Sequence, residues 1–206
     1  KVVLLNGCPR KGWNTDLVQH KAAEGAESVG AVTEIIDLYD LDFMGCRSCM
    51  ACNRVEGGGF GRCTWNDGLK PVLEEIDKVD DLVLGSPCVL GGRHRRDACF
   101  PGAVPLPVHE FRYGRVGIQG TPEGGVHLHD ERPDRMHERA LCINKQFLEP
   151  HVRYAGTVEC SETLQVEDYR KYHLGFFDGK QRRQCRKTVF SEDCWKAFEL
   201  GKAVAQ

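Results

Sequence analysis

Short apolar runs alternate with amphipathic stretches along most of this 206-residue chain. The apolar runs predict strands over residues 2–5, 32–38, 81–84, 116–118 and 158–164. Apolar residues at helical spacing predict helices whose buried faces lie within residues 18–29, 69–76, 136–147 and 194–204. Asp67 and Ser191 are the expected caps of the second and the last of these helices. Strands that alternate with helices favour parallel β-α-β units, so we expect one α/β domain over residues 1–206 with a five-stranded parallel sheet.

The stretch 93–115 breaks this alternation. Three prolines, at positions 101, 105 and 107, stand close to Gly102 and exclude one regular helix here. We expect at most a short helical piece near residues 95–100, followed by an irregular connection.

Charge and hydropathy argue against two classes of partner. The net charge of −2 does not suggest a nucleic-acid binder, and no run of 18 apolar residues predicts a transmembrane helix. The first apolar run has four residues, too few for a signal peptide. Basic clusters at 93–96 and 180–187 are interpreted as solvated faces. We therefore expect a cytoplasmic protein that contacts neither nucleic acid nor membrane.

The cysteine content points to thiol or metal chemistry. The chain has 11 cysteines, and without a secretory segment reduced thiols are more plausible than a disulfide framework. Cys46, Cys49 and Cys52 are each separated by two residues, and Cys63 follows after ten more, in a cysteine-rich insertion about 45–66. Four thiolates at such spacing suit a [4Fe-4S] cluster, and tetrahedral zinc would accept the same ligands. Thiols without a metal are the alternative.

The segment NGCPRKGWNT follows the first predicted strand and opens the first helix. A helix start presents unpaired N–H groups and the positive end of the helix dipole, which together bind anions. Arg10 adds charge, and Asn14 and Thr15 add side-chain donors, so a phosphate monoester would be well held. The segment is neither a Walker loop nor a G-x-G-x-x-G fingerprint. The alternative is a plain capped helix after a turn.

Several motifs together resemble one family. After NGCPRKGWNT come GCRSCMAC, GRCTWNDGLKPVLEEI and DLVLGSP, and later TLQVEDYRKY and FSEDCWKAFELGK. In this order they resemble the NADPH-dependent FMN reductase family of the flavodoxin-like superfamily, over most of residues 1–92 and about 163–203. The resemblance implies a flavodoxin-like three-layer sandwich that binds FMN, with NADPH or NADH as electron donor.

The resemblance also implies which residues hold the flavin. Arg10, Asn14 and Thr15 would hold the FMN phosphate, with Cys8 at the usual serine position. The second loop would run beside the flavin through Pro87, Cys88, Val89, Leu90 and Gly91, and the third loop would contribute Gln119 and Gly120. Cys8, Val89 and the third loop depart from the family pattern. No general acid or base is expected, because the cofactor carries the chemistry. His127 and His129 are candidates for a substrate pocket or are surface histidines.

Three functions follow from these features. The first is an NAD(P)H-dependent oxidoreductase that passes electrons to a flavin, a quinone or a similar small-molecule acceptor. The second is an electron carrier like the iron–sulfur flavoproteins, relatives on the same fold that have a compact cysteine motif in this region. The last cysteine gap is longer here, and the resembled branch often keeps these cysteines without a demonstrated cluster. The third is a flavin-free structural or binding protein. The resemblance also implies a homodimer.

Overall fold

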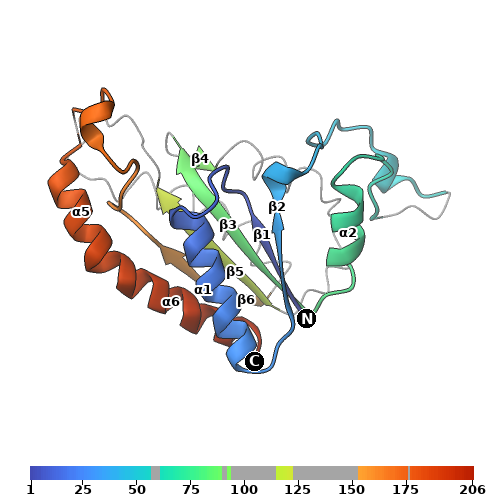
Figure 1. The fold of residues 1–206 in the computed structure, drawn as a ribbon. Coiled ribbons are helices and arrows are strands. Elements are labelled where there is room, and N and C mark those ends of the chain that lie inside the picture. Colours follow the sequence, from blue (N-terminus) through green and yellow to red (C-terminus); the bar gives the residue numbers. More distant parts are fainter. Residues whose placement is uncertain (57–60, 90–91, 94–114, 123–152, 176) are drawn as a thin grey trace.

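A computed structural model describes residues 1–56, 61–89, 92–93, 115–122, 153–175 and 177–206. Its sheet has six strands, which are β1 (Val2–Asn6), β2 (Thr33–Asp37), β3 (Asp81–Val89), β4 (Gly92–Arg93), β5 (Arg115–Pro122) and β6 (Arg153–Glu159). Five of them run parallel in the order β2-β1-β3-β5-β6, and the two-residue β4 pairs antiparallel with β3. The predicted α/β class with a parallel sheet is therefore confirmed (Figure 1).

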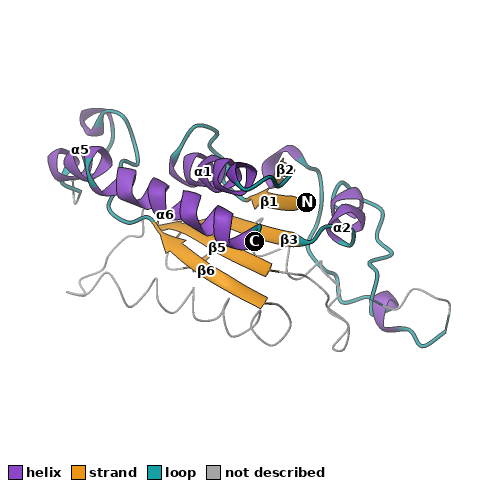
Figure 2. Cartoon of the chain, turned by 90° about the horizontal axis from the view of Figure 1, so that it is seen from below, coloured by secondary structure: helices purple, strands orange, loops and turns teal. Residues whose placement is uncertain are grey.

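Helices cover both faces of the sheet. The described α-helices are α1 (Asn14–Ser28), α2 (Lys70–Ile76), α5 (Gly179–Lys187) and α6 (Val189–Val204). Three short 3₁₀ helices are η1 (Leu38–Asp40), η2 (Ala51–Asn53) and η3 (Tyr169–Lys171). Alternate residues of β1 point to opposite faces, so Val2 and Leu4 join a core with α1 and α6, while Val3 and Leu5 join a core with α2. Figure 2 shows α1 and α6 together on one side of the strands.

Close packing of α1 against α6 depends on two glycines. A Cβ on Gly25 would lie 1.9 Å from the carbonyl oxygen of Phe198. A Cβ on Gly201 would lie 1.9 Å from the carbonyl oxygen of Ala22. Each helix therefore places its backbone directly against the other, and a side chain at either glycine would force the two helices apart.

Several predicted boundaries were wrong. The last strand lies at residues 153–159 rather than 158–164, and β3 continues to Val89 through residues that were predicted to form a loop. Ser191 is not a cap, because α6 begins at Val189 and the Ser191 amide donates to the carbonyl of Thr188 at 3.2 Å. Helix α5 was not predicted. Asp67 is not the N-cap of α2 either, because Leu69 takes that position; the Asp67 carboxylate accepts from the Leu69 amide at 3.0 Å.

The predicted helix within 136–147 and most of the stretch 93–115 lie outside the described residues. Within the described ranges, none of the helices has the length and apolar character needed to cross a bilayer.

Candidate functional site

The loop between β1 and α1 starts where β1 and β2 end together, beside the continuing strand β3. Asn6 is paired with Asp37 of β2 and with Gly85 of β3, so the loop leaves the carboxyl edge of the sheet between two neighbours. The Gly7 amide donates to the Gly85 carbonyl at 2.9 Å. Ligands of parallel α/β sheets bind in the crevice beyond this edge. The fold therefore places residues 7–13, which we call the first loop, where a ligand is expected.

The buried side-chain amide of Asn6 holds the first loop in place. The Asn6 amide nitrogen donates to Asp16 Oδ1 and to Asp37 Oδ1, both at 2.8 Å, and the Cys8 amide donates to Asn6 Oδ1 at 3.0 Å. Asp16 Oδ2 accepts from the amide of Gly12 at 2.7 Å, and Gly12 has a φ of 75° that favours glycine. The shape of the loop is thus fixed before any ligand arrives.

Lys11 is engaged at the outer side of the first loop. Its ammonium lies 2.5 Å from Asp40 Oδ2 and 3.0 Å from Asp37 Oδ2. Hydrogen bonds to Asp40 and then Asp37 raise the pKa of Lys11 above its ordinary value. Its positive charge is therefore matched by two carboxylates at the end of β2.

Arg10, Asn14 and Thr15 lie in the first loop and the first turn of α1, and two of them bond to another part of the chain. Arg10 Nη1 donates to the carbonyl of Gln165 at 2.6 Å, and its guanidinium lies 4.4 Å from the Trp13 ring centroid. Asn14 Nδ2 donates to the carbonyl of Leu164 at 2.9 Å. Asn14 and Thr15 are both buried. Cys8 is buried too, and its thiol donates to the Arg10 carbonyl at 3.3 Å.

The second and third predicted loops belong largely to the sheet. Ser86 and Pro87 of β3 pair with Gly120 and Thr121 of β5, and Gln119 of β5 pairs with Gly85. Cys88 and Val89 pair with Arg93 and Gly92 of β4. The carboxyl end of β3 therefore stands between the first loop and β5. Leu90, Gly91, His127 and His129 lie outside the described residues.

The structure adds a segment that the sequence analysis did not place at the site. Residues 160–165, which we call the strap, follow β6 and accept bonds from Arg10 and Asn14 on the opposite side of the site. Arg182 Nη1 donates to the Thr163 carbonyl at 3.1 Å, and the Gln165 amide donates to the Tyr169 hydroxyl at 3.1 Å. The strap is thus anchored from both sides.

Two arginines of the basic cluster 180–187 are not part of a solvated face, which corrects that interpretation. Arg182 and Arg186 are half-buried and stack on Phe177 and Phe190, at 4.3 and 3.8 Å from the ring centroids. Arg186 Nη1 donates to Asn14 Oδ1 at 2.7 Å. The available sequence signal was the spacing of these four residues. Arg186 follows Arg182 by four residues, and Phe177 lies five before Arg182 while Phe190 lies four after Arg186.

The four cysteines of the predicted metal motif line one cavity of about 200 Å³, here called the cysteine pocket. Met44, Met50 and Trp65 line it as well, and the Arg47 guanidinium lies 4.6 Å from the Trp65 ring centroid. Burial, and after it the neighbouring thiols Cys46, Cys49 and Cys63, raise the pKa of the Cys52 thiol. In the part of the chain that the structure describes, no group of three or more His, Cys, Asp or Glu side chains lies close enough together to hold a metal ion.

Comparison with known proteins identifies the N-terminal part of the chain. The family model for NADPH-dependent FMN reductases matches residues 1–92. Residues 1–92 are therefore similar to this family. The matched segment contains the first loop, the cysteine pocket and the end of β3, whereas the strap and α5 lie beyond it.

Curated relatives are iron–sulfur flavoproteins. One from Methanocaldococcus jannaschii is 32% identical over 130 residues, which cover 61% of this chain and 65% of the relative. Another, from Archaeoglobus fulgidus, is 33% identical over 117 residues, which cover 57% of this chain and 51% of the relative. The chain therefore spans less than two thirds of the length of either relative.

Solved structures support the flavodoxin-like fold that the FMN reductase family implies. An NAD(P)H:quinone oxidoreductase from Methanothermobacter marburgensis superposes with a TM-score of 0.61 at 13% identity, covering 100% of this chain and 96% of that protein. An FMN-dependent NADH-azoreductase from Bacillus anthracis, solved with FMN, gives 0.62 at 14% identity, covering 100% and 99%. At these identities the likeness shows the fold alone.

Proposed function

We propose that this protein binds FMN at the carboxyl edge of its sheet and acts as an NAD(P)H-dependent oxidoreductase. NADH or NADPH would reduce the flavin, and a flavin, a quinone or a similar small molecule would accept the electrons. The observation that carries the proposal is the preformed first loop, in a segment of the NADPH-dependent FMN reductase family, at the start of the 15-residue helix α1.

The residues at this edge fit a flavin phosphate. The positive end of α1 attracts an anion, and Arg10 and Arg186 bring two guanidinium groups to the same helix start. The buried Thr163 Oγ1 of the strap has no hydrogen-bond partner among the described residues, so it has capacity for a polar ligand atom. Bound FMN would supply hydride and electron transfer, while the chain would supply position and charge.

The site residues remain those of the family pattern. We propose Arg10, Asn14 and Thr15 for the phosphate and Pro87, Cys88, Val89, Leu90 and Gly91, with Gln119 and Gly120, for the flavin ring. The Cys8 thiol already donates within the first loop, so we expect its backbone to matter more than its sulfur.

An anaerobic absorbance spectrum of the purified full chain, recorded before and after adding NADPH or NADH, tests the proposal. Flavin peaks that bleach with either nucleotide are the expected result, and the faster nucleotide identifies the donor. A flavin spectrum that neither nucleotide changes would favour an electron carrier. A protein that stays colourless after FMN is added would overturn the proposal.

A second candidate function rests on the cysteine pocket. We propose that Cys46, Cys49, Cys52 and Cys63 hold a [4Fe-4S] cluster, which would make the protein an electron carrier like its curated relatives. The supporting observation is that all four thiols line one cavity, and four thiols are the donor set that such a cluster requires. Iron coordination would then draw the sulfur atoms together, since the chain alone does not hold three of them at ligand distance.

Anaerobic reconstitution followed by iron and sulfide analysis tests this second candidate. About four iron and four sulfide per chain are expected, falling sharply in Cys52→Ser but not in the matched control Cys185→Ser on α5. Zinc without sulfide would identify a zinc site instead. No metal under these conditions would leave the four residues as thiols and exclude the cluster.

Assembly and location complete the proposal. We propose a homodimer in the cytoplasm, because the described cysteines are all free thiols and the resembled family often forms dimers with the flavin near the interface. Sedimentation equilibrium of the FMN-loaded chain should give twice the 23.1 kDa of one chain. A monomer at all concentrations would contradict this.

A further inference from the structure

A guanidinium group lies at the start of α1 without a carboxylate beside it. Arg186 is half-buried in α5, and among the described residues it donates to Asn14 Oδ1 and to no carboxylate. Arginine stays charged at neutral pH, and a partly buried charge is costly unless a counter-charge compensates it. Burial accordingly lowers the pKa of this guanidinium from its ordinary value. The chain itself supplies no such counter-charge among the residues that the structure describes.

The bond from Arg186 fixes the orientation of Asn14. A guanidinium only donates, so the atom of Asn14 that faces it must be the oxygen Oδ1. The amide nitrogen then turns to the Leu164 carbonyl at 2.9 Å. Asn14 is the first residue of α1 and is buried, so both bonds act on the turn that carries the unpaired N–H groups.

The other charges near this helix start explain why a further cation is needed. The Asp16 carboxylate, in the first turn of α1, is buried and would repel an anion held there. The charge of Lys11 is matched by Asp37 and Asp40. His20 Nε2 lies 3.9 Å from Asp16 Oδ2, and Arg10 and Arg186 add two guanidinium groups that make this helix start attractive to a phosphate dianion.

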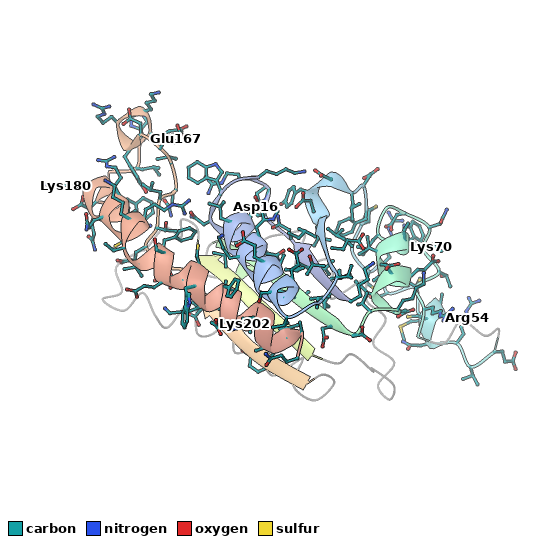
Figure 3. The ribbon with its side chains drawn as sticks, turned by 60° about the horizontal axis from the view of Figure 1, so that its bottom comes forward. Asp16, Arg54, Lys70, Glu167, Lys180 and Lys202 are labelled. Atoms are coloured by element: carbon teal, nitrogen blue, oxygen red, sulfur yellow. The ribbon has the colours of Figure 1, made fainter. Side chains whose placement is uncertain are left out.

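We propose that Arg186 is a positioning residue for the phosphate monoester of FMN. It holds Asn14 and the first turn of α1 in place, and it brings a positive charge to this helix start. This inference rests on the proposed FMN function. Figure 3 labels Asp16 on α1 and Lys180 at the start of α5, the helix that carries Arg186.

Binding of FMN and of riboflavin, which lacks the phosphate, separates this role from a structural one. Titrations of the full apo chain are compared for wild type, Arg186→Gln and Arg186→Lys, with Arg183→Gln as matched control, since Arg183 is exposed on the same helix. We expect Arg186→Gln to weaken FMN binding about tenfold or more and to leave riboflavin binding within about twofold. Arg186→Lys should fall between, because it keeps the charge but loses the planar fork. The control should match wild type.

A double-mutant cycle tests whether Arg186 acts through Asn14. If it does, Asn14→Ala combined with Arg186→Gln should weaken FMN binding by less than the product of the two single effects. Circular dichroism identifies any variant that fails to fold, and the Lys variant then serves in place of the Gln variant.

Failure of this inference and failure of the proposed function give different results. Wild type and Arg186→Gln could both bind FMN more tightly than riboflavin by the same factor. Arg186 would then have no role at the phosphate, while the proposed function would stand. A parallel loss of both flavins in Arg186→Gln has the same meaning. If wild type binds neither flavin, the proposed function itself fails.

Discussion

Asn6 shows how much one side chain contributes to the candidate site. Its amide nitrogen bridges Asp16 of α1 and Asp37 of β2, and its oxygen accepts from the backbone of the first loop. Asn6 is fully buried at the carboxyl end of β1, an interior strand of the sheet. From the sequence, Asn6 was expected directly after the first strand, but its three partners come from segments whose approach only the fold reveals.

Replacing Asn6 should therefore destabilise the protein. Asn6→Ala removes a donor from the buried Asp16 carboxylate, and leaving such a group short of partners costs about 1–3 kcal/mol. We expect the free energy of unfolding in urea to fall by roughly that amount. Asn53→Ala is the control, because Asn53 is exposed and should change it by less than about 0.5 kcal/mol. Equal effects of the two changes would contradict the role given to Asn6.

Asp168 provides a prediction about pH. Its carboxylate accepts from the side chain of Arg170 at 2.9 Å and from the Arg170 backbone amide, and these bonds lower the pKa of Asp168 from 3.8 to about 2. A lowered folded-state pKa means that the stabilisation is complete above about pH 4 and is lost as the pH falls towards 2.

This titration can be followed by carboxyl NMR. Asp168 should titrate near pH 2 in wild type and closer to its ordinary value in Arg170→Ala, which removes the largest cause of the shift. An unchanged titration in Arg170→Ala would assign the shift to the backbone bond alone. Asp168 caps η3, and the Tyr169 hydroxyl of η3 accepts from the Gln165 amide of the strap. Protonation of Asp168 should therefore also weaken the hydrogen bond that holds Gln165.

At the scale of elements, the sequence predicted the helices and strands that have a clear apolar pattern and missed those that have none. Strand β1 was recognised because its apolar run is continuous, as expected for a strand buried on both faces. Helix α5 has the sequence GKQRRQCRK, with no apolar stripe, so only its cap Asp178 could have indicated it. The end of β3 was missed because Pro87 argues against a strand interior; Pro87 stands near the end of β3, beyond the residues that pair with β1.

The contact between α1 and α6 gives a prediction for the pair of helices. Gly201→Ala would improve intrinsic helix propensity by about 1 kcal/mol. Its Cβ, however, would meet the Ala22 carbonyl at 1.9 Å, and overpacking of this kind costs about 1–3 kcal/mol or more. We expect a net loss of stability and a lower Tm by calorimetry. Ser191→Ala, in the exposed first turn of α6, should be nearly neutral, and an equal or larger loss there would contradict the boundary found for this helix.

At the scale of the whole molecule, the two candidate sites occupy different places. Figure 3 shows Arg54, next to the cysteine pocket, and Lys180 of α5 at opposite ends, with Asp16 of the first turn of α1 between them. One sheet joins these regions, drawing strands from residue 2 to residue 159. The single domain expected over residues 1–206 remains a prediction.

Unfolding experiments can test that single domain. The three tryptophans report on separate regions, because Trp13 lies in the first loop, Trp65 lines the cysteine pocket and Trp195 is exposed on α6. If the chain is one cooperative unit, urea transitions followed by fluorescence and by circular dichroism should coincide. Variants that retain one tryptophan each, with the others changed to phenylalanine, should share the same midpoint. A separate transition for Trp65 would make the cysteine region an independent unit.

The strap has a consequence for how the protein is made. Arg10 and Asn14 reach partners about 150 positions further along the chain, and Arg186 returns to Asn14 from 172 positions away. Contacts of such sequence separation are slow to form, because long loops must close first. During synthesis the first loop stays without these partners until residue 186 has emerged. The pocket for an anionic ligand would thus mature late, and a chain that stops short of residue 186 could not complete it.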